Sequence, residues 1–336
     1  MEGKPWSPAD LLQLSGGYWS ACALHAGVKL DVFTPLADRA LASAELAEAL
    51  KSDARGVAML INALAALGLL AKKGDIYTDT PFAAEFLCRT SPRYLGHIIL
   101  HHHHLIEGWA HLDEAVKGGG PIRKRVSHDV GEDERESFEM GMFNLAMQIA
   151  PRIVPRIDLS GRRRLLDLGG GPGTYAIHFC MENPDLTAVV YDLPTTRPFA
   201  ERTIDRFGLT GRIAFADGDF IAEGIEGPFD VAWLSHILHG EGPEGCAVIL
   251  KKVVSALEPG GMILVQEFIL DDSLDSPLFP ALFSLNMLIG TPSGRAYSEG
   301  ELINMLAAAG VGDLKRLPLE LPNGAGVIAG TVARER

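Results

Sequence analysis

The sequence contains few cysteines and no long apolar segment. Four cysteines occur among 336 residues, and their wide spacing excludes a dense disulfide framework and a zinc site built from paired cysteines. No apolar run approaches the roughly 20 residues that cross a bilayer, and residues 1–10 lack the basic start and apolar core of a signal peptide. We therefore expect a cytoplasmic protein without a membrane partner, whose thiols stay reduced.

Basic charge is also scarce. The formal net charge is −13, and the basic residues are scattered apart from the run at 162–164. No positive field is therefore present to attract a polyanion, and we expect no nucleic-acid partner. Hydrophobic residues make up 47% of the chain, which is enough to build one large globular core or two ordinary ones.

The hydrophobic pattern divides the chain into two parts. From about Leu11 to Arg156, apolar residues recur three and four positions apart, which predicts a mainly α-helical domain over residues 1–157. From Arg164 onward, short apolar runs alternate with helical segments, which predicts an α/β domain with a parallel sheet over residues 158–336. The last apolar run follows no helix and predicts a closing hairpin, with a tight turn at Asn323 and Gly324. The expected parallel strands are 164–169, 187–193, 212–218, 229–235 and 262–270.

A glycine-rich loop follows the first expected strand. Glycines at this point let a ligand approach the backbone, and the next helix offers free N–H groups to an anionic group. The third glycine comes one place too early for a dinucleotide fingerprint, and no Lys-Ser/Thr pair follows for a P-loop. The remaining pattern is Asp167 at the strand end with Gly169 and Gly171 in the loop. It suits a ligand with a zwitterionic amino-acid tail, which predicts S-adenosylmethionine, with S-adenosylhomocysteine as its product.

Acidic residues at the ends of the next strands extend this hypothesis. Asp192 ends the second strand, where a carboxylate can accept both hydroxyls of a ribose. After the third strand, Asp219 can accept from an adenine amino group while Phe220 covers a ring face. The alternative for each aspartate is an ordinary strand-end turn. We include Leu193 and Ser235 among the expected cofactor-binding residues.

With these residues in order, the sequence resembles the class I S-adenosylmethionine-dependent small-molecule O-methyltransferases of the caffeic-acid and acetylserotonin (hydroxyindole) type. The resemblance covers nearly the whole chain and implies a Rossmann-like domain with a mostly parallel seven-stranded sheet and an antiparallel C-terminal strand. It also implies an N-terminal helical, winged-helix domain that forms a homodimer, with residues 74–80 as the wing. A DNA-binding winged helix is disfavoured because residues 54–68 are mostly apolar with a single arginine.

Methyl transfer to a hydroxyl requires a base, and the fourth expected strand is followed by two histidines, His236 and His239. Spacing does not choose between them. The resemblance implies His239 as the general base and His236 as a structural residue. It also implies that Glu267 orients His239, which agrees with the cost of burying an unpaired carboxylate in a parallel strand. Ala296 stands where related plant enzymes have a second glutamate, which is a departure from their pattern.

The acceptor pocket is expected to use two parts of the chain. Phe283, Asn286 and Met287 precede a loop in the second part. A helix near residues 95–111 places His102 and Trp109 on its apolar face, and on the opposite face we expect a solvated or interface stripe of His97, His101, His104 and His111. The helix near residues 136–151 is expected to pack Phe138, Met142 or Phe143 over the cofactor side, with Met142 also counted as substrate-binding. We expect no catalytic metal.

The resulting prediction is an S-adenosylmethionine-dependent O-methyltransferase that acts on a hydroxyl of an aromatic or polyketide-like small molecule. The alternatives are C- or N-methylation on the same fold, or a regulatory protein that holds the cofactor without turnover.

Overall fold

The computed structural model describes residues 5–123 and 131–333, and its contacts group the chain into two compact units. The first unit comprises Met1–Leu105 and Glu136–Asn144, and the second comprises Ile106–Arg135 and Leu145–Arg336. Two helices, α6 (Gly96–Ala110) and α8 (Glu132–Ile153), therefore contribute residues to both units. The expected boundary between residues 157 and 158 follows the change of hydrophobic pattern and remains a prediction.

The first unit is mainly helical and includes a small antiparallel sheet in the order β1-β3-β2. Asp53 begins α4 by accepting the backbone N–H of Gly56, and Gly74, with φ +64°, makes the turn between β2 and β3. This hairpin is the expected wing. Leu46, Ile61 and Leu64 are fully buried beneath it. The elements are α1 (Pro8–Ser15), α2 (Tyr18–Lys29), η1 (Thr34–Leu36), β1 (Leu41–Ala42), α3 (Ser43–Ala49), α4 (Ala54–Ala66), β2 (Leu70–Lys73), β3 (Ile76–Asp79) and α5 (Pro81–Phe86).

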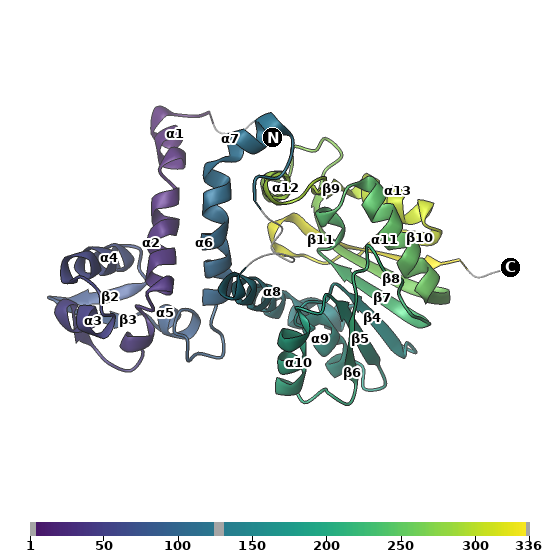
Figure 1. Cartoon of the computed structure of the whole chain (residues 1–336), viewed down its shortest axis with the longest axis horizontal. Helices are drawn as coiled ribbons and strands as arrows, with labels where there is room; N and C mark the ends of the chain where they lie inside the picture. Colours follow the sequence, from purple (N-terminus) through teal and green to yellow (C-terminus); the bar gives the residue numbers. More distant parts are fainter. Residues whose placement is uncertain (1–4, 124–130, 334–336) are drawn as a thin grey trace. The chain divides into compact units, whose positions relative to one another are not determined.

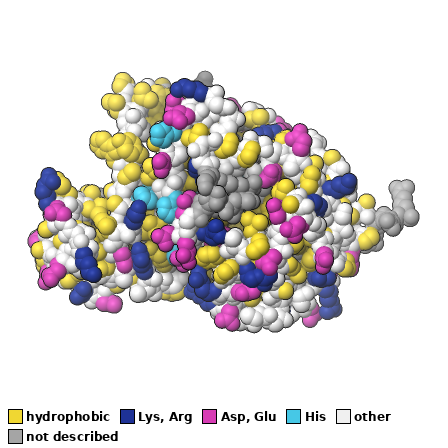
Figure 2. Space-filling model, viewed as in Figure 1, with side chains coloured by type: hydrophobic (Ala, Val, Ile, Leu, Met, Phe, Trp, Pro, Cys, Tyr) yellow, Lys and Arg dark blue, Asp and Glu magenta, His cyan; other side chains and the backbone are white. Residues whose placement is uncertain are grey.

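Helix α1 and the start of α2 expose large apolar side chains. Leu12 is 72% exposed and Trp19 is 69% exposed. Figure 2 shows hydrophobic side chains gathered over these helices. The interior of the unit packs beneath the opposite end of α2, where His25, Gly27 and Val28 are buried.

The histidine-rich segment forms the expected helix α6, but its faces differ from the prediction. His101 is buried and packs edge-on against Phe138 of α8, with ring centroids 5.3 Å apart. His102, expected on the apolar face, is exposed. His101 is therefore not solvated, because the segment of α8 that belongs to the first unit covers it, while the interface alternative for the other histidines of the stripe stays a prediction. Helix periodicity alone does not show which faces a later helix covers.

The second unit is a doubly wound α/β sheet, as predicted, with helices on both faces (Figure 1). The strand order is β10-β11-β8-β7-β4-β5-β6, with the short β9 beside β8. Strands β8, β7, β4, β5 and β6 are parallel, and β11 is antiparallel to β8, which confirms the antiparallel C-terminal strand. None of the described helices is long and apolar enough to cross a membrane.

The remaining elements follow the predicted alternation. They are α7 (Leu112–Gly118), η2 (Val154–Arg156), β4 (Arg164–Leu168), α9 (Thr174–Glu182), β5 (Thr187–Asp192), α10 (Arg197–Arg206), β6 (Ile213–Asp217), β7 (Phe229–Ser235), η3 (Leu238–Gly240), α11 (Pro243–Ala256), β8 (Leu257–Leu270), α12 (Leu278–Gly290), β9 (Tyr297–Ser298), α13 (Glu299–Ala308), β10 (Val311–Arg316), η4 (Pro322–Gly324) and β11 (Ala325–Val332).

Two apolar cores cover the two faces of this sheet. One contains Leu165 and Trp233, and the other contains Leu166 and Leu234, so neighbouring residues of a strand point to opposite cores. Burial on both faces explains why the strands read as continuous apolar runs. The carboxyl ends of the parallel strands consequently meet at one edge, where ligands bind in such folds.

The expected closing hairpin is present as β10 and β11, which pair antiparallel. Its connection is longer than the tight turn that we expected, because residues 317–324 lie between the strands. Asn323 and Gly324 do adopt positive φ values of 58° and 69°, but inside the short helix η4. The dipeptide therefore makes a left-handed bend at the end of a longer loop.

Candidate active site

The glycine loop between β4 and α9 turns the backbone sharply. Gly169, Gly171 and Gly173 all have positive φ values, of 60°, 54° and 77°. Residues other than glycine rarely adopt such values. A Cβ atom at Gly169 would stand 2.2 Å from Ile237 Cδ1, and 3.5 Å from Phe220 Cε1. The bare backbone and the Phe220 ring therefore lie side by side at the carboxyl edge of the sheet.

Asp167 lies fully buried beneath this loop. Its Oδ2 accepts the N–H of Ala176 over 3.1 Å, whereas its Oδ1 has no hydrogen-bond partner among the described residues. Burial raises the pKa of Asp167 to about 7, against the Ala176 hydrogen bond, and the charge of Asp192 adds to the rise. A buried carboxylate with a free oxygen favours a positively charged partner. The residues present therefore fit a ligand with an ammonium group, such as S-adenosylmethionine.

Asp192, at the end of β5, is tied to the same loop. Its Oδ2 accepts the N–H of Gly171 over 2.8 Å, and its Oδ1 accepts the N–H of Leu193 over 2.7 Å. Burial raises the pKa of Asp192, while these two hydrogen bonds oppose the rise. Asp192 Oδ1 also accepts the Thr196 hydroxyl over 3.4 Å, so Oδ2 is the oxygen that keeps a lone pair for a hydroxyl group.

The third strand end forms a local turn around Asp219. Its Oδ1 accepts the N–H groups of Ile221 and Ala222, over 2.8 Å and 3.3 Å. This is the strand-end turn that the sequence left open as an alternative, and it leaves Oδ2 for a ligand. Ser235 ends β7, and its hydroxyl interacts with the buried Tyr175. The structure thus brings all eight expected cofactor-binding residues to one edge of the second unit, and their roles stay predictions.

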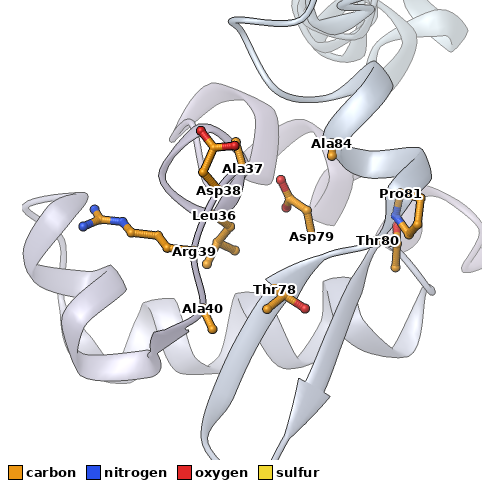
Figure 3. Close-up of a pocket in the computed structure, with 10 residues that line it drawn as sticks. All are labelled: Leu36, Ala37, Asp38, Arg39, Ala40, Thr78, Asp79, Thr80, Pro81 and Ala84. Carbon is orange, nitrogen blue, oxygen red and sulfur yellow. The ribbon is translucent and has the colours of Figure 1, made fainter.

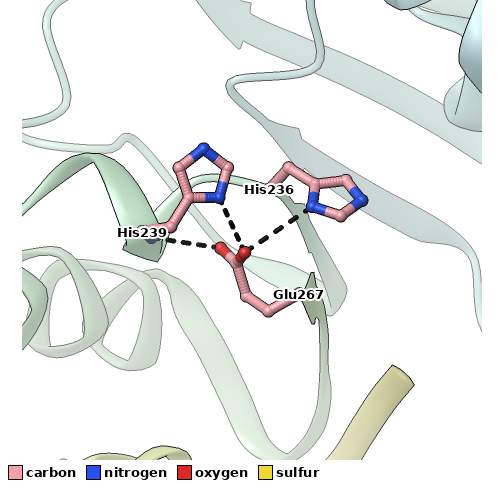
Figure 4. A group of neighbouring side chains, drawn as sticks. All are labelled: His236, His239 and Glu267. Atoms are coloured by element: carbon pink, nitrogen blue, oxygen red, sulfur yellow. Dashed lines mark hydrogen bonds and ion pairs between the residues drawn. The ribbon is translucent and has the colours of Figure 1, made fainter. Parts of the chain in front are cut away.

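His239 and Glu267 form a hydrogen-bonded pair beside this edge (Figure 4). His239 Nδ1 lies 2.7 Å from Glu267 Oε2, and the backbone N–H of His239 donates to Glu267 Oε1 over 3.2 Å. His239 belongs to η3, and Glu267 is 2% exposed within β8. An ionised carboxylate only accepts hydrogen bonds, so this pair places the imidazole proton on Nδ1 and leaves Nε2 as a free base.

His236 lies against the same carboxylate, with its Nδ1 3.6 Å from Glu267 Oε2. Burial alone would raise the pKa of Glu267, but His239 and His236 more than offset this effect and hold the pKa well below its usual range. Glu267 therefore stays ionised at neutral pH. The sequence indicated His236 only as a structural residue near the pocket and did not predict this contact.

Aromatic side chains surround the pair. Phe283 of α12 packs edge-on against the His239 ring, with centroids 4.8 Å apart, and it packs at the same distance against Phe268 of β8. Trp109 Nε1 donates to Asn286 Oδ1 over 3.2 Å, and Met287 is buried. Sequence reasoning missed Phe268, although its place beside Glu267 was a signal. Four expected acceptor residues thus belong to the second unit, three of them on α12 and Trp109 bonded to it. His102 and Met142 belong to the first unit and stay predictions.

Comparison with known proteins adds the family. A family model for an O-methyltransferase domain matches residues 109–312, and one for an O-methyltransferase dimerisation domain matches residues 12–89. The chain is 34% identical to a 3-hydroxy-5-methyl-1-naphthoate 3-O-methyltransferase of Streptomyces sahachiroi, over 97% of this chain and 96% of that protein. The chain belongs to the O-methyltransferase family. This confirms the predicted family, fold class and enzyme class.

Two further relatives of this O-methyltransferase are also methyltransferases. The tetracenomycin polyketide synthesis 8-O-methyl transferase TcmO of Streptomyces glaucescens is 32% identical, over 94% of this chain and 95% of that protein. The solved structure of PigF, from Serratia sp., with S-adenosylhomocysteine (SAH) has a TM-score of 0.89 and 26% identity, and it covers 97% of this chain and all of that one. S-adenosylmethionine as the predicted methyl donor is thereby confirmed.

Ala296, which stands where related plant enzymes have a second glutamate, lies in a buried position of this O-methyltransferase. Ala296 is 1% exposed, and its backbone N–H donates to Ser284 Oγ over 3.1 Å. Its neighbour Arg295 pairs with Glu301 over 2.5 Å. A buried alanine has no group for proton transfer, so this position cannot take the part of the second glutamate of the related plant enzymes.

A separate hollow of about 440 Å³ lies in the first unit of the O-methyltransferase (Figure 3). Leu36, Arg39 and Thr78 are among its lining residues, and Asp79 is another. Neither oxygen of Asp79 has a hydrogen-bond partner among the described residues, and burial raises the pKa of this carboxyl to about 7. Asp79 consequently weakens the fold whenever it is ionised.

Proposed function

We propose that the chain methylates a hydroxyl group of a flat, polyketide-type aromatic molecule, with His239 as the general base. The observation that carries the base assignment is the 2.7 Å contact between His239 Nδ1 and buried Glu267. It fixes one tautomer, so the free Nε2 can accept the proton of the hydroxyl. S-adenosylmethionine supplies an electrophilic methyl group on a positively charged sulfur.

The side chains around His239 determine how the acceptor is held. Phe283 and Phe268 offer ring faces and edges to a planar acceptor, since aromatic pairs favour offset or edge-to-face packing. Trp109 and Asn286 are locked together by their hydrogen bond and fix the helix α12 that carries Phe283. As the acceptor oxygen bonds to the methyl carbon and the carbon–sulfur bond breaks, its proton passes to His239 Nε2. The ionised Glu267 stabilises the resulting imidazolium.

The two Streptomyces relatives support the acceptor class, because one acts on a hydroxynaphthoate and the other in tetracenomycin polyketide synthesis. A screen of phenolic and quinol acceptors with methyl-labelled S-adenosylmethionine tests this class. Structure determination of the product then distinguishes O-methylation from methylation at carbon or nitrogen. A label found only on carbon or nitrogen would refute the proposed reaction.

The base role has its own test. We expect His239→Ala to bind S-adenosylmethionine with unchanged affinity, measured by calorimetry, because His239 does not belong to the glycine loop or its carboxylates. Turnover should fall by about 10²- to 10⁴-fold, the usual effect of losing a general base. Turnover that equals that of the unmodified protein would exclude His239 as the base.

We further propose a homodimer formed through the first unit. The dimerisation-domain match and the apolar side chains exposed on α1 and α2 support it, since apolar patches of this kind mark interaction surfaces. Light scattering of the full chain should give twice the chain mass. A single-chain mass at micromolar concentration would contradict the dimer.

A further inference from the structure

His236 brings a third donor atom to Glu267. The distance of 3.6 Å between His236 Nδ1 and Glu267 Oε2 is too long for a hydrogen bond. His236 Nδ1 is nevertheless buried and has no hydrogen-bond partner among the described residues. In Figure 4 both imidazoles turn their Nδ1 atoms toward the same carboxylate. The proposed methyl transfer uses His239 and Glu267 and gives no task to this nitrogen.

The orientation of His236 is fixed from several sides. Its backbone has a φ of 59°, and its N–H donates to Gln266 O over 2.8 Å. Its Nε2 lies 3.2 Å from Gln266 Nε2, and its ring packs against Phe268 with centroids 4.3 Å apart. The Gln266 NH₂ group donates to Nε2, which places the His236 proton on Nδ1. Binding a metal through Nδ1 therefore moves this proton to Nε2, and the unpartnered Gln266 Oε1 can accept it once the amide turns over.

The three donor atoms form a set that a transition metal prefers. One ligand atom each from His236, His239 and Glu267 lies within 4.8 Å of the other two, and both Nδ1 atoms face Glu267 Oε2. Two imidazoles and one carboxylate bind zinc at about 2.0–2.2 Å, which places tetrahedral ligands ~3.3 Å apart. The separation of 3.6 Å between His236 and Glu267 is near this value. The 2.7 Å separation between His239 and Glu267 has to open by about 0.6 Å.

An ion can also reach this position. The side chains of His236 and His239 are 25% and 15% exposed, whereas Glu267 is 2% exposed and supplies the buried negative charge. We propose that His236, His239 and Glu267 form an inhibitory site for Zn²⁺ or a related late transition-metal ion, with water in the fourth position.

The inhibitory effect follows from the atom that the ion would occupy. Coordination through His239 Nδ1 leaves the single proton of the neutral imidazole on Nε2. His239 can then no longer take a proton from the acceptor. This effect rests on the proposed function, in which His239 is the base, whereas the metal site itself depends only on the three donor atoms.

The histidine-rich helix α6 is the competing place for a metal. There, His103 Nε2 lies 3.0 Å from Lys29 Nζ, and a lysine cation beside an imidazole opposes the binding of a second cation. His103→Gln is therefore a matched control, because it removes a histidine outside the proposed site.

The test uses the full chain, freed of metal with a chelator. We expect one Zn²⁺ per chain by calorimetry, and with Co²⁺ the visible absorption of a four- or five-coordinate ion. His236→Asn, which tolerates a positive φ, and Glu267→Gln should each weaken binding by at least about tenfold and abolish the absorption. His103→Gln should bind as the unmodified chain does. Equal binding by His236→Asn, loss of binding in His103→Gln, or a six-coordinate Co²⁺ spectrum would overturn the site.

Turnover is measured in the same titration. We expect Zn²⁺ at saturation to suppress methyl transfer by the unmodified chain, and a chelator to restore it. Site-specific binding that leaves turnover unchanged would overturn the inhibitory effect and would also speak against His239 as the base. Absence of binding, with the His239→Ala result as expected, would overturn the metal site and leave the proposed function intact.

Discussion

Glu267→Gln keeps the shape of the side chain and removes its charge. Glu267 accepts two hydrogen bonds from His239, one from Nδ1 and one from the backbone N–H, over 2.7 Å and 3.2 Å. A glutamine has one oxygen and one NH₂ group, so it can accept only one of them and turns a donor toward the other. If the NH₂ group faces the ring, His239 must carry its proton on Nε2, which cannot then act as a base.

The size of the expected effect of Glu267→Gln on the activation barrier follows from the charge that is lost. A hydrogen bond to a charged group contributes about 1.5–3 kcal/mol, and breaking a buried ion pair costs about 3–5 kcal/mol. Because the imidazolium forms during the reaction, we expect the activation barrier to rise by about 3–5 kcal/mol. At 1.36 kcal/mol per factor of ten, this lowers kcat by about 10²- to 10⁴-fold.

The assay is single-turnover transfer of labelled methyl from S-adenosylmethionine, with cofactor affinity measured by calorimetry. Affinity should stay within about threefold, since Glu267 lies outside the glycine loop. Glu244→Gln is the matched control, because Glu244 is exposed at the start of α11, and it should leave kcat unchanged. If Glu267→Gln kept kcat within a factor of three, the orienting role would be refuted.

Three further changes test other parts of the molecule. In Gly170→Ala the new Cβ would stand 2.7 Å from Asp167 Cγ, so calorimetry should show at least about tenfold weaker cofactor binding (~1.4 kcal/mol), whereas Gly211→Ala, with open space around it, should bind normally. Phe283→Ala removes a ring that packs against His239, Phe268 and Phe279 and that we expect to contact the acceptor. An aromatic contact contributes about 0.5–1.5 kcal/mol, so the acceptor KM should rise by up to about tenfold while cofactor affinity stays constant. Asp79 has its pKa raised from 3.8 to about 7, so it destabilises the fold as pH rises from about 4 to 7. Asp79→Asn should therefore raise the free energy of unfolding of the first unit, measured by urea denaturation, by about 1–2 kcal/mol at pH 8 after allowance for solvent screening. Near pH 3.5 the free energy of unfolding should stay unchanged, and an equal gain at both pH values would contradict this.

Local patterns were sufficient for much of the fold. The βα alternation after Arg164 follows directly from strand burial on both faces, and positive-φ glycines mark the turn into α9. His239 and Glu267 could be paired before the structure because an unpaired carboxylate in a buried strand is costly and because the resemblance places a histidine opposite it. Both arguments depend on short segments of sequence.

Contacts between distant segments could not be predicted in the same way. The burial of His101 depends on a helix more than thirty positions away in the chain, and the hydrogen bond from Trp109 to Asn286 spans 177 positions. His236 reaches Glu267 because its backbone takes a left-handed conformation directly after β7. The hydrophobic periodicity of the sequence cannot predict such a bend, because it describes only regular helices and strands.

The division of α6 between the two units limits how this enzyme can be recombined. A graft that began at residue 158 would not include Trp109, so in the recipient Asn286 would lose its indole donor. Chimeras intended to exchange acceptor preference among relatives should therefore carry residues 106–135 together with 145–336. Residues 106–135 thus belong with the candidate active site, although they precede the sheet by several tens of positions in the chain.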